Sequence, residues 1–287
     1  MGELSIKSIL GWVFSLALLL VGGLYLGLAI ARKAGQYWDK TPLTIIVQTG
    51  PQREALQTTY LAQLMELSAE SPICTGQFDI KKASAALLNS PVIKEAKVFF
   101  LRPGILYVDY TLRQPIALLA DYENTAIDVE GKIFPLSPFF PPKNLPEIYL
   151  GLEGARNWNT SVKGEALDLA YELLSLFRST EVAELFLVKR LDVSRIEEKS
   201  LGKKEIVILI EDVIICKEGC LIVPRYIRLS LKNYRESLRN YWKLRIHLIE
   251  SERATLASFK QGQTLLYGPL KIIDLRLSKM ALIDTTN

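Results

Sequence analysis

Hydrophobic residues form one unbroken run near the N-terminus of the 287-residue chain and recur with shorter periods after it. From Ser8 to Ala31 there are 24 residues without a charge. At 1.5 Å per residue a helix of this length extends about 36 Å, which is enough for a hydrocarbon core of ~30 Å. The run therefore predicts a transmembrane helix over residues 9–31, with a cytoplasmic tail over residues 1–8.

A cleaved signal peptide is the alternative interpretation of this run, because Ala29-Ile30-Ala31 resembles a small-residue cleavage site. The apolar part of a signal peptide usually has only ~7–15 residues, so we favour an uncleaved anchor. Basic residues flank both ends of the run, and the positive-inside rule weakly favours the opposite orientation to that of an exported domain, but long domains translocate largely regardless of such counts. Almost the whole chain follows the span, and we expect that part to be exported.

The segment after the span predicts a small domain over residues 43–114, joined by a juxtamembrane linker over residues 32–42. A β-branched run indicates a first strand, and apolar residues at helical spacing indicate two helices, the second capped by Asp79. A proline-glycine turn then separates two more strands. The expected elements are strand Thr44–Gly50, helix Arg53–Leu67, helix Ile80–Leu88, strand Lys94–Leu101 and strand Ile105–Leu112.

This β-α-α-β-β order lets two helices cover one face of a three-stranded sheet and leaves an edge strand free. Residues 115–287 predict a second domain, a mixed sheet with two helices, so the fold class is α+β. Two short strands precede a proline-rich stretch. The elements expected after it are helix Glu165–Arg178, strands Ala183–Asp192, Glu205–Ile215 and Leu221–Leu231, helix Asn233–Ile246, and strands Leu270–Leu277 and Lys279–Ile283.

The composition and the absence of known motifs exclude several classes of function. With 35 basic against 31 acidic side chains the net charge is +4, which is too mild for a dedicated nucleic-acid binder. The single histidine, His247, excludes His-rich metal sites, and we interpret it as structural. The sequence has no Gly-rich phosphate loop and no nucleophile elbow. We therefore assign no catalytic, cofactor-binding or metal-binding residue and expect no enzyme.

Cys216 and Cys220 flank the tripeptide Lys-Glu-Gly. In a short hairpin loop these positions can face one another closely enough for a disulfide, which an exported domain permits. The alternative is that Cys216 and Cys220 are free thiols, and a metal-binding or redox role is the least favoured hypothesis. Cys74 has no obvious disulfide partner in the sequence, and we interpret it as a small apolar side chain.

One predicted helix is rich in basic residues, and several acidic pairs stand in polar contexts. We interpret the basic side of this helix as a solvated surface. The alternative hypothesis is that it binds an anionic polymer or an acidic partner. We read Glu250 and Glu252 as solvated surface. The basic residues are Lys232, Arg235, Arg239, Lys243 and Arg245.

Five motifs in a fixed order resemble the FtsQ/DivIB family of bacterial cell-division proteins, and the first domain resembles a POTRA domain. Each motif is weak by itself, and their order makes the resemblance more specific. The motifs are LLNSPVIKEAKV (87–98), RPGILYVDYTLRQPIA (102–117), IDVEGKIFPLS (127–137), LPEIYLG (145–151) and IIDLRLSKMALI (272–283).

The resemblance implies a non-enzymatic bitopic scaffold that links early division proteins to septal peptidoglycan synthesis. Such a protein lies in the cell (inner) membrane at the division septum, with a cytoplasmic N-terminus and a periplasmic or extracytoplasmic bulk. Its implied partners are the FtsB/DivIC- and FtsL-type bitopic proteins, with no nucleic acid and no cofactor.

The resemblance also implies where the partner binds. The candidate edge for β-strand addition consists of Lys279, Met280, Ala281, Leu282 and Ile283. From the residues alone, Leu282 and Ile283 could equally well finish the core. The alternative function is a POTRA-type docking protein of an envelope secretion or assembly system.

Overall fold

The computed structural model describes residues 6–50, 54–158, 160–179, 186–200, 202–215, 219–256, 265–277 and 279–285. The chain divides into two compact units, which we call unit 1 (Met1–Leu112) and unit 2 (Arg113–Asn287). Both units contain helices and β-sheet, which confirms the predicted α+β class. The division falls close to the domain boundary that we expected between residues 114 and 115.

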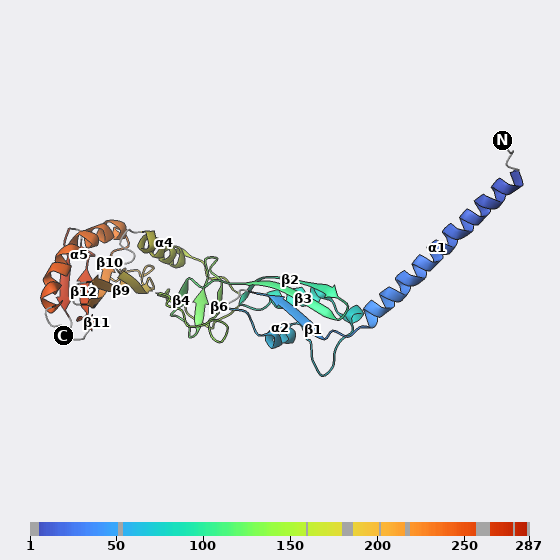
Figure 1. The fold of residues 1–287 in the computed structure, drawn as a ribbon. Coiled ribbons are helices and arrows are strands. Elements are labelled where there is room, and N and C mark those ends of the chain that lie inside the picture. The colour runs from blue at the N-terminus through green and yellow to red at the C-terminus, as the bar shows by residue number, and fades with distance from the viewer. Residues whose placement is uncertain are drawn as a thin grey trace. The chain divides into compact units, whose positions relative to one another are not determined.

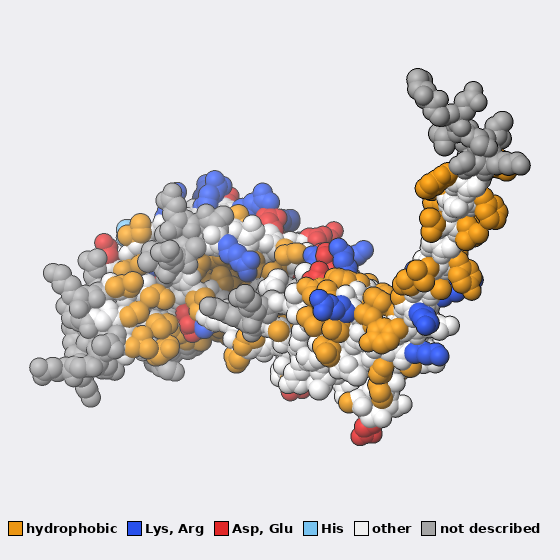
Figure 2. All heavy atoms as spheres, turned by 45° about the vertical axis from the view of Figure 1, so that its right-hand side comes forward, with side chains coloured by type: hydrophobic (Ala, Val, Ile, Leu, Met, Phe, Trp, Pro, Cys, Tyr) orange, Lys and Arg blue, Asp and Glu red, His pale blue; other side chains and the backbone are white. Residues whose placement is uncertain are grey.

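Unit 1 begins with the helix α1 (Ile6–Lys40), which contains the long apolar run. The stretch Leu10–Lys40 of this helix is long and apolar enough to cross a membrane, and it is the one such helix among the described residues. Hydrophobic side chains project from it on several sides (Figure 2). The expected linker over residues 32–42 is helical for most of its length, because α1 continues to Lys40. The helix ends before Pro42, since the residue preceding a proline avoids the helical conformation.

The rest of unit 1 follows the predicted β-α-α-β-β order (Figure 1). The strands pair in the order β1-β3-β2, parallel between β1 and β3 and antiparallel between β2 and β3. A short 3₁₀ turn, η1, lies between the helices. The elements are β1 (Ile45–Thr49), α2 (Thr58–Leu64), η1 (Thr75–Gln77), α3 (Ile80–Leu88), β2 (Ile93–Arg102) and β3 (Ile105–Leu112).

Local signals place α3 and the β2–β3 turn as predicted. The carboxylate of Asp79 accepts hydrogen bonds from the backbone N–H groups of Lys81 (2.8 Å) and Lys82 (3.1 Å) and so caps α3. Gly104 in the turn has φ +77°, and a Cβ there would lie 2.8 Å from the carbonyl oxygen of Pro42. The helix α2 is shorter than the expected Arg53–Leu67, because it begins only at Thr58 and ends at Leu64, just before Glu66 adopts a positive φ.

One face of the small sheet is covered and forms the core of unit 1. Leu106, Val108 and Tyr110 alternate along β3 and are buried, as are Leu61 of α2 and Leu87 of α3. Burial of each such side chain contributes roughly 1.5–3 kcal/mol, so this face holds the unit together.

Unit 2 contains a ten-stranded mixed sheet in the order β13-β12-β10-β9-β8-β7-β4-β5-β6, with β11 also paired to β10. The region of residues 115–137 forms three short strands and not the expected two, and neither β7 nor β11 was predicted. The strands are β4 (Ala117–Leu119), β5 (Thr125–Ile127), β6 (Ile133–Pro135), β7 (Glu147–Tyr149), β8 (Phe186–Asp192), β9 (Ile206–Ile215), β10 (Cys220–Leu229), β11 (Leu265–Tyr267), β12 (Lys271–Asp274) and β13 (Leu282–Thr285).

The helices α4 (Glu165–Ser179) and α5 (Tyr234–Leu256) pack against one face of this sheet (Figure 1). The core between the helices and the sheet contains alternate residues of β9, and Leu167, Ala170, Leu174 and Phe177 of α4 are buried in it. Helix α5 extends well past its predicted end at Ile246. The other face of the sheet carries polar side chains between apolar ones.

Candidate partner-binding site

The strand β13 stands at one end of the large sheet. It pairs antiparallel with β12, with Ile283 opposite Ile273 and Leu282 opposite Asp274. In the part of the chain that the structure describes, no strand lies along its other side. An edge of this kind presents backbone N–H and C=O groups that a partner strand can bind.

The hydrogen-bond pattern shows which backbone groups face outward. The N–H of Leu275 donates to the carbonyl oxygen of Arg228 at 2.9 Å. Because directions alternate along a strand, Ile272 and Asp274 of β12 turn their N–H and C=O groups toward β13. Their register partners are Asp284 and Leu282. The backbone groups of Ile283 and Thr285 therefore point away from the sheet.

The side chains of this edge are exposed. Leu282 is 54% exposed and Ile283 is 46% exposed, so neither finishes the core. Ile283 shares the helix-covered face with buried Ile273, and Leu282 points to the opposite face with Asp274. A strand added here would meet an apolar side chain on each face of the sheet.

The other three predicted residues do not belong to the strand. Lys279 adopts φ +62°, which interrupts an extended chain, and the N–H of Met280 bonds back to the carbonyl oxygen of Leu277 at 3.4 Å. The predicted strand over residues 279–283 therefore begins only at Leu282. Lys279, Met280 and Ala281 form the turn that leads into it.

This turn forms one wall of a hollow of about 360 Å³. The first turns of α5 form the other wall, and the Oγ of Ser237 donates to the carbonyl oxygen of Leu275 at 3.2 Å. Leu277 and Met280 are exposed, so part of the lining is apolar. The lining residues are Asn233, Glu236, Ser237, Asn240, Leu244, Leu275, Leu277, Lys279, Met280 and Ala281.

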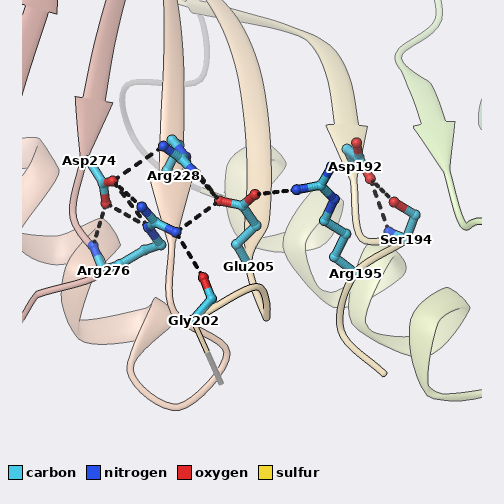
Figure 3. A network of polar contacts seen from close by, with 8 residues as sticks. All are labelled: Asp192, Ser194, Arg195, Gly202, Glu205, Arg228, Asp274 and Arg276. Carbon is cyan, nitrogen blue, oxygen red and sulfur yellow. Dashed lines mark hydrogen bonds and ion pairs between the residues drawn. The ribbon is translucent and has the colours of Figure 1, made fainter. Parts of the chain in front are cut away.

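Behind the edge lies a network of ion pairs centred on Glu205, shown in Figure 3. The carboxylate of this buried residue accepts from Arg228 at 2.6 Å and from Arg195 at 3.2 Å, and Arg276 lies 3.3 Å away. Asp274, the last residue of β12, binds the guanidinium of Arg276 at 2.7 Å. The network thus joins the ends of β9, β10 and β12 and fixes the chain as it leaves β12.

The electrostatics agree with this geometry. Partial burial opposes ionisation of Asp274, but the hydrogen bonds from the Arg276 side chain and backbone outweigh it and lower the pKa of that carboxyl. Sequence reasoning missed Glu205 and Arg228 as parts of the site. The Asp-Leu-Arg of residues 274–276 was the available signal, because it places a carboxylate and a guanidinium at the end of a strand.

Two further sequence predictions concern cysteine and histidine. Cys220 begins β10 and stands opposite Ile215 in the register. Cys216 lies outside the described residues, so its pairing with Cys220 stays a prediction. His247 is exposed on α5, with its Nδ1 3.9 Å from a carboxylate oxygen of Glu250. Within the described ranges no group of three or more His, Cys, Asp or Glu side chains could hold a metal ion.

Lys232, Arg235, Arg239 and Lys243 are exposed, as expected for a solvated helix face, whereas Arg245 and Glu252 are buried. Arg245 is buried and binds Asp212 of β9 at 2.6 Å. Glu252 is also buried, with its carboxylate 2.7 Å from Arg225 and 2.7 Å from the ammonium of Lys271. These charges form a layer between α5 and the sheet, which sequence spacing could not reveal.

In comparisons with known proteins, no family model matches the chain, and no curated protein matches it at a significant level. What the β13 edge can bind therefore follows from its outward backbone groups, its exposed apolar side chains and the hollow beside it.

Proposed function

We propose that the protein is a non-enzymatic, single-pass membrane scaffold of bacterial cell division that binds its partner by strand addition at β13. The observation that carries the proposal is the open edge of the large sheet, where Ile283 and Thr285 turn their backbone groups outward. The helix α1 supports membrane anchoring through its length and apolar surface.

Strand addition explains the features of this edge together. A partner strand would form hydrogen bonds with the outward N–H and C=O groups, each contributing a net ~0.5–1.5 kcal/mol. Leu282 and Ile283 would contact its side chains on opposite faces and so set the register. The hollow beside Met280 has room for an apolar side chain of the segment flanking that strand.

The resemblance of the sequence to the FtsQ/DivIB family supplies the cellular context of the proposal. Unit 1 then acts as a POTRA-like domain next to the membrane, and unit 2 presents the binding edge. The partners would be FtsB/DivIC- and FtsL-type bitopic proteins, and the scaffold would connect early division proteins to septal peptidoglycan synthesis.

Imaging of a fluorescent fusion tagged at the N-terminal end tests the cellular part of the proposal. We expect a band at the division site that appears before constriction finishes. A uniform envelope signal through the whole cycle would contradict a division role and favour docking in an envelope secretion or assembly system. Co-purification of the partners from the same cells then separates these two functions.

A further inference from the structure

Unit 1 carries an exposed apolar patch on the face of its sheet that α2 and α3 leave open. Ile45 and Val47 of β1 lie beside Ile105 and Tyr107 of β3 in the register. On the other side of β3, Phe99 stands opposite Tyr107, and their rings lie 4.6 Å apart. Leu101, at the bulge just before the turn, is also exposed. We call these exposed apolar side chains the turn-end patch: Ile45, Val47, Phe99 and Leu101.

The patch lies at the end of the sheet that is attached to α1. The carbonyl oxygen of Gly104, in the β2–β3 turn, accepts from the N–H groups of Thr44 (3.1 Å) and Ile45 (3.3 Å), just after α1 ends. The ring of Trp38 in α1 lies 6.2 Å from that of Phe100 in β2. The turn is thus held against the last turn of the helix.

The length of α1 determines how far this turn can lie from a bilayer. The uncharged run ends at Ala31, and the nine helical residues from Arg32 to Lys40 extend about 13 Å. The polar headgroup layer on each side of a bilayer is roughly 5–8 Å thick. With α1 upright across the membrane, the end of the helix and the β2–β3 turn held against it lie about 5–8 Å beyond the headgroup layer.

The charges near the turn suit an anionic membrane surface. Arg32, Lys33 and Lys40 line the end of α1, and the exposed Arg102 ends β2 just before the turn. Asp39 is the acidic residue of the same stretch. Hydrophobic and basic side chains occur together on the surface next to the base of α1 in Figure 2. Aromatic and aliphatic groups combined with arginine and lysine are typical of interfacial membrane contacts.

We propose that the turn-end patch, together with Arg102, docks into the headgroup layer of an anionic lipid bilayer and holds unit 1 against the membrane. The inference rests on α1 as a membrane span, which is part of the proposed function, and it is independent of strand addition at β13. The bilayer is the favoured occupant because α1 brings this one end of the sheet to it.

Site-specific photocrosslinking in the full chain tests the proposal. The photoreactive amino acid p-benzoylphenylalanine replaces Leu101, and the protein is reconstituted in vesicles of phosphatidylethanolamine and phosphatidylglycerol. Leu88 provides the matched control, because it is 47% exposed against 54% for Leu101. It precedes the opposite end of β2, which lies about 30 Å away along the strand. A third variant carries the crosslinker at Leu18 within α1.

We expect about fivefold more lipid adduct at Leu101 than at Leu88, and a reduced yield when Arg102→Glu is added. Equal adduct at Leu101 and Leu88, with strong adduct at Leu18, would overturn the patch and leave the membrane anchor intact. Absence of adduct at Leu18 as well would overturn the anchor itself. A protein adduct in place of lipid at Leu101 in living cells would overturn the lipid assignment and identify a protein partner.

Discussion

Within the described residues, the sheet of unit 1 and the sheet of unit 2 each have a face that no described helix covers, and these faces differ in chemistry. In unit 1 the open face bears the turn-end patch, whose apolar side chains stay exposed next to α1. In unit 2 the open face is crossed by ion pairs between neighbouring strands. These pairs are Lys189 with Glu211, Arg190 with Glu147, and Arg228 with Glu205.

The difference indicates where each unit makes contact. Charges that pair with one another across strands satisfy a solvated face, so the open face of unit 2 has little need of a cover. The binding that we propose for unit 2 instead uses the backbone of its edge strand β13. In unit 1 the uncovered surface is made of side chains, and we expect it to bind through apolar contact. Different substitutions should therefore disable the two surfaces.

Among changes to charged residues, the largest loss in the free energy of unfolding is expected on the covered face of unit 2. There, acidic and basic side chains are buried. Asp212 binds Arg245 and Arg225 there at 2.6 and 3.1 Å. Asp212→Ala leaves two guanidinium groups without their shared carboxylate, and we expect a loss of about 3–5 kcal/mol in the free energy of unfolding. Urea unfolding of the full chain in detergent measures it.

The matched control for this change is Glu147→Ala on the open face. Its exposed pair with Arg190 should contribute only about 0–1 kcal/mol. Equal losses in the two variants would contradict the distinction between covered and open charges.

The next largest effect is expected on partner binding at the backbone of the edge strand β13. Ile283→Pro removes an outward N–H without touching the ladder between β12 and β13, because Leu282 and Asp284 make the internal bonds. We expect binding of a co-expressed FtsB/DivIC-type partner to weaken at least about tenfold, with unit 2 still folded. Ile283→Ala keeps the N–H and should weaken binding less. Wild-type capture by the proline variant would exclude strand addition at this residue.

The sequence predicts features of the fold and of the β13 edge that depend on neighbouring residues better than features that depend on residues far apart in the chain. The unbroken apolar run predicts α1, and Asp79 correctly predicts the start of α3, because both signals are local. The start of β13 was misplaced, since nothing in the residues before Leu282 indicates the positive φ of Lys279. The pairing of Asp212 with Arg245 was also missed, because the fold brings these two charges together from separate elements.

A smaller effect follows from the lowered pKa of Asp274. A carboxyl whose pKa is lower in the folded than in the unfolded chain stabilises the fold above its ordinary pKa of 3.8. That stabilisation is lost as the pH falls through the lowered folded value. The unfolding midpoint of Asp274→Asn should therefore lie below that of the wild type at pH 6, and the difference should shrink below pH 4. A difference that stays constant down to pH 2 would show that the charge of Asp274 is not what stabilises this edge.

The smallest effect is expected on the open face of unit 1. Leu101→Asp places a charge where the side chain is already exposed, so the free energy of unfolding in detergent should change by no more than about 0.5 kcal/mol. Leu106→Asp on the covered face buries an unpaired charge and should unfold unit 1. Thermal unfolding of the full chain in detergent compares the two. If both variants lose stability alike, the face of unit 1 that α2 and α3 leave open is packed against protein and is not free to meet the membrane.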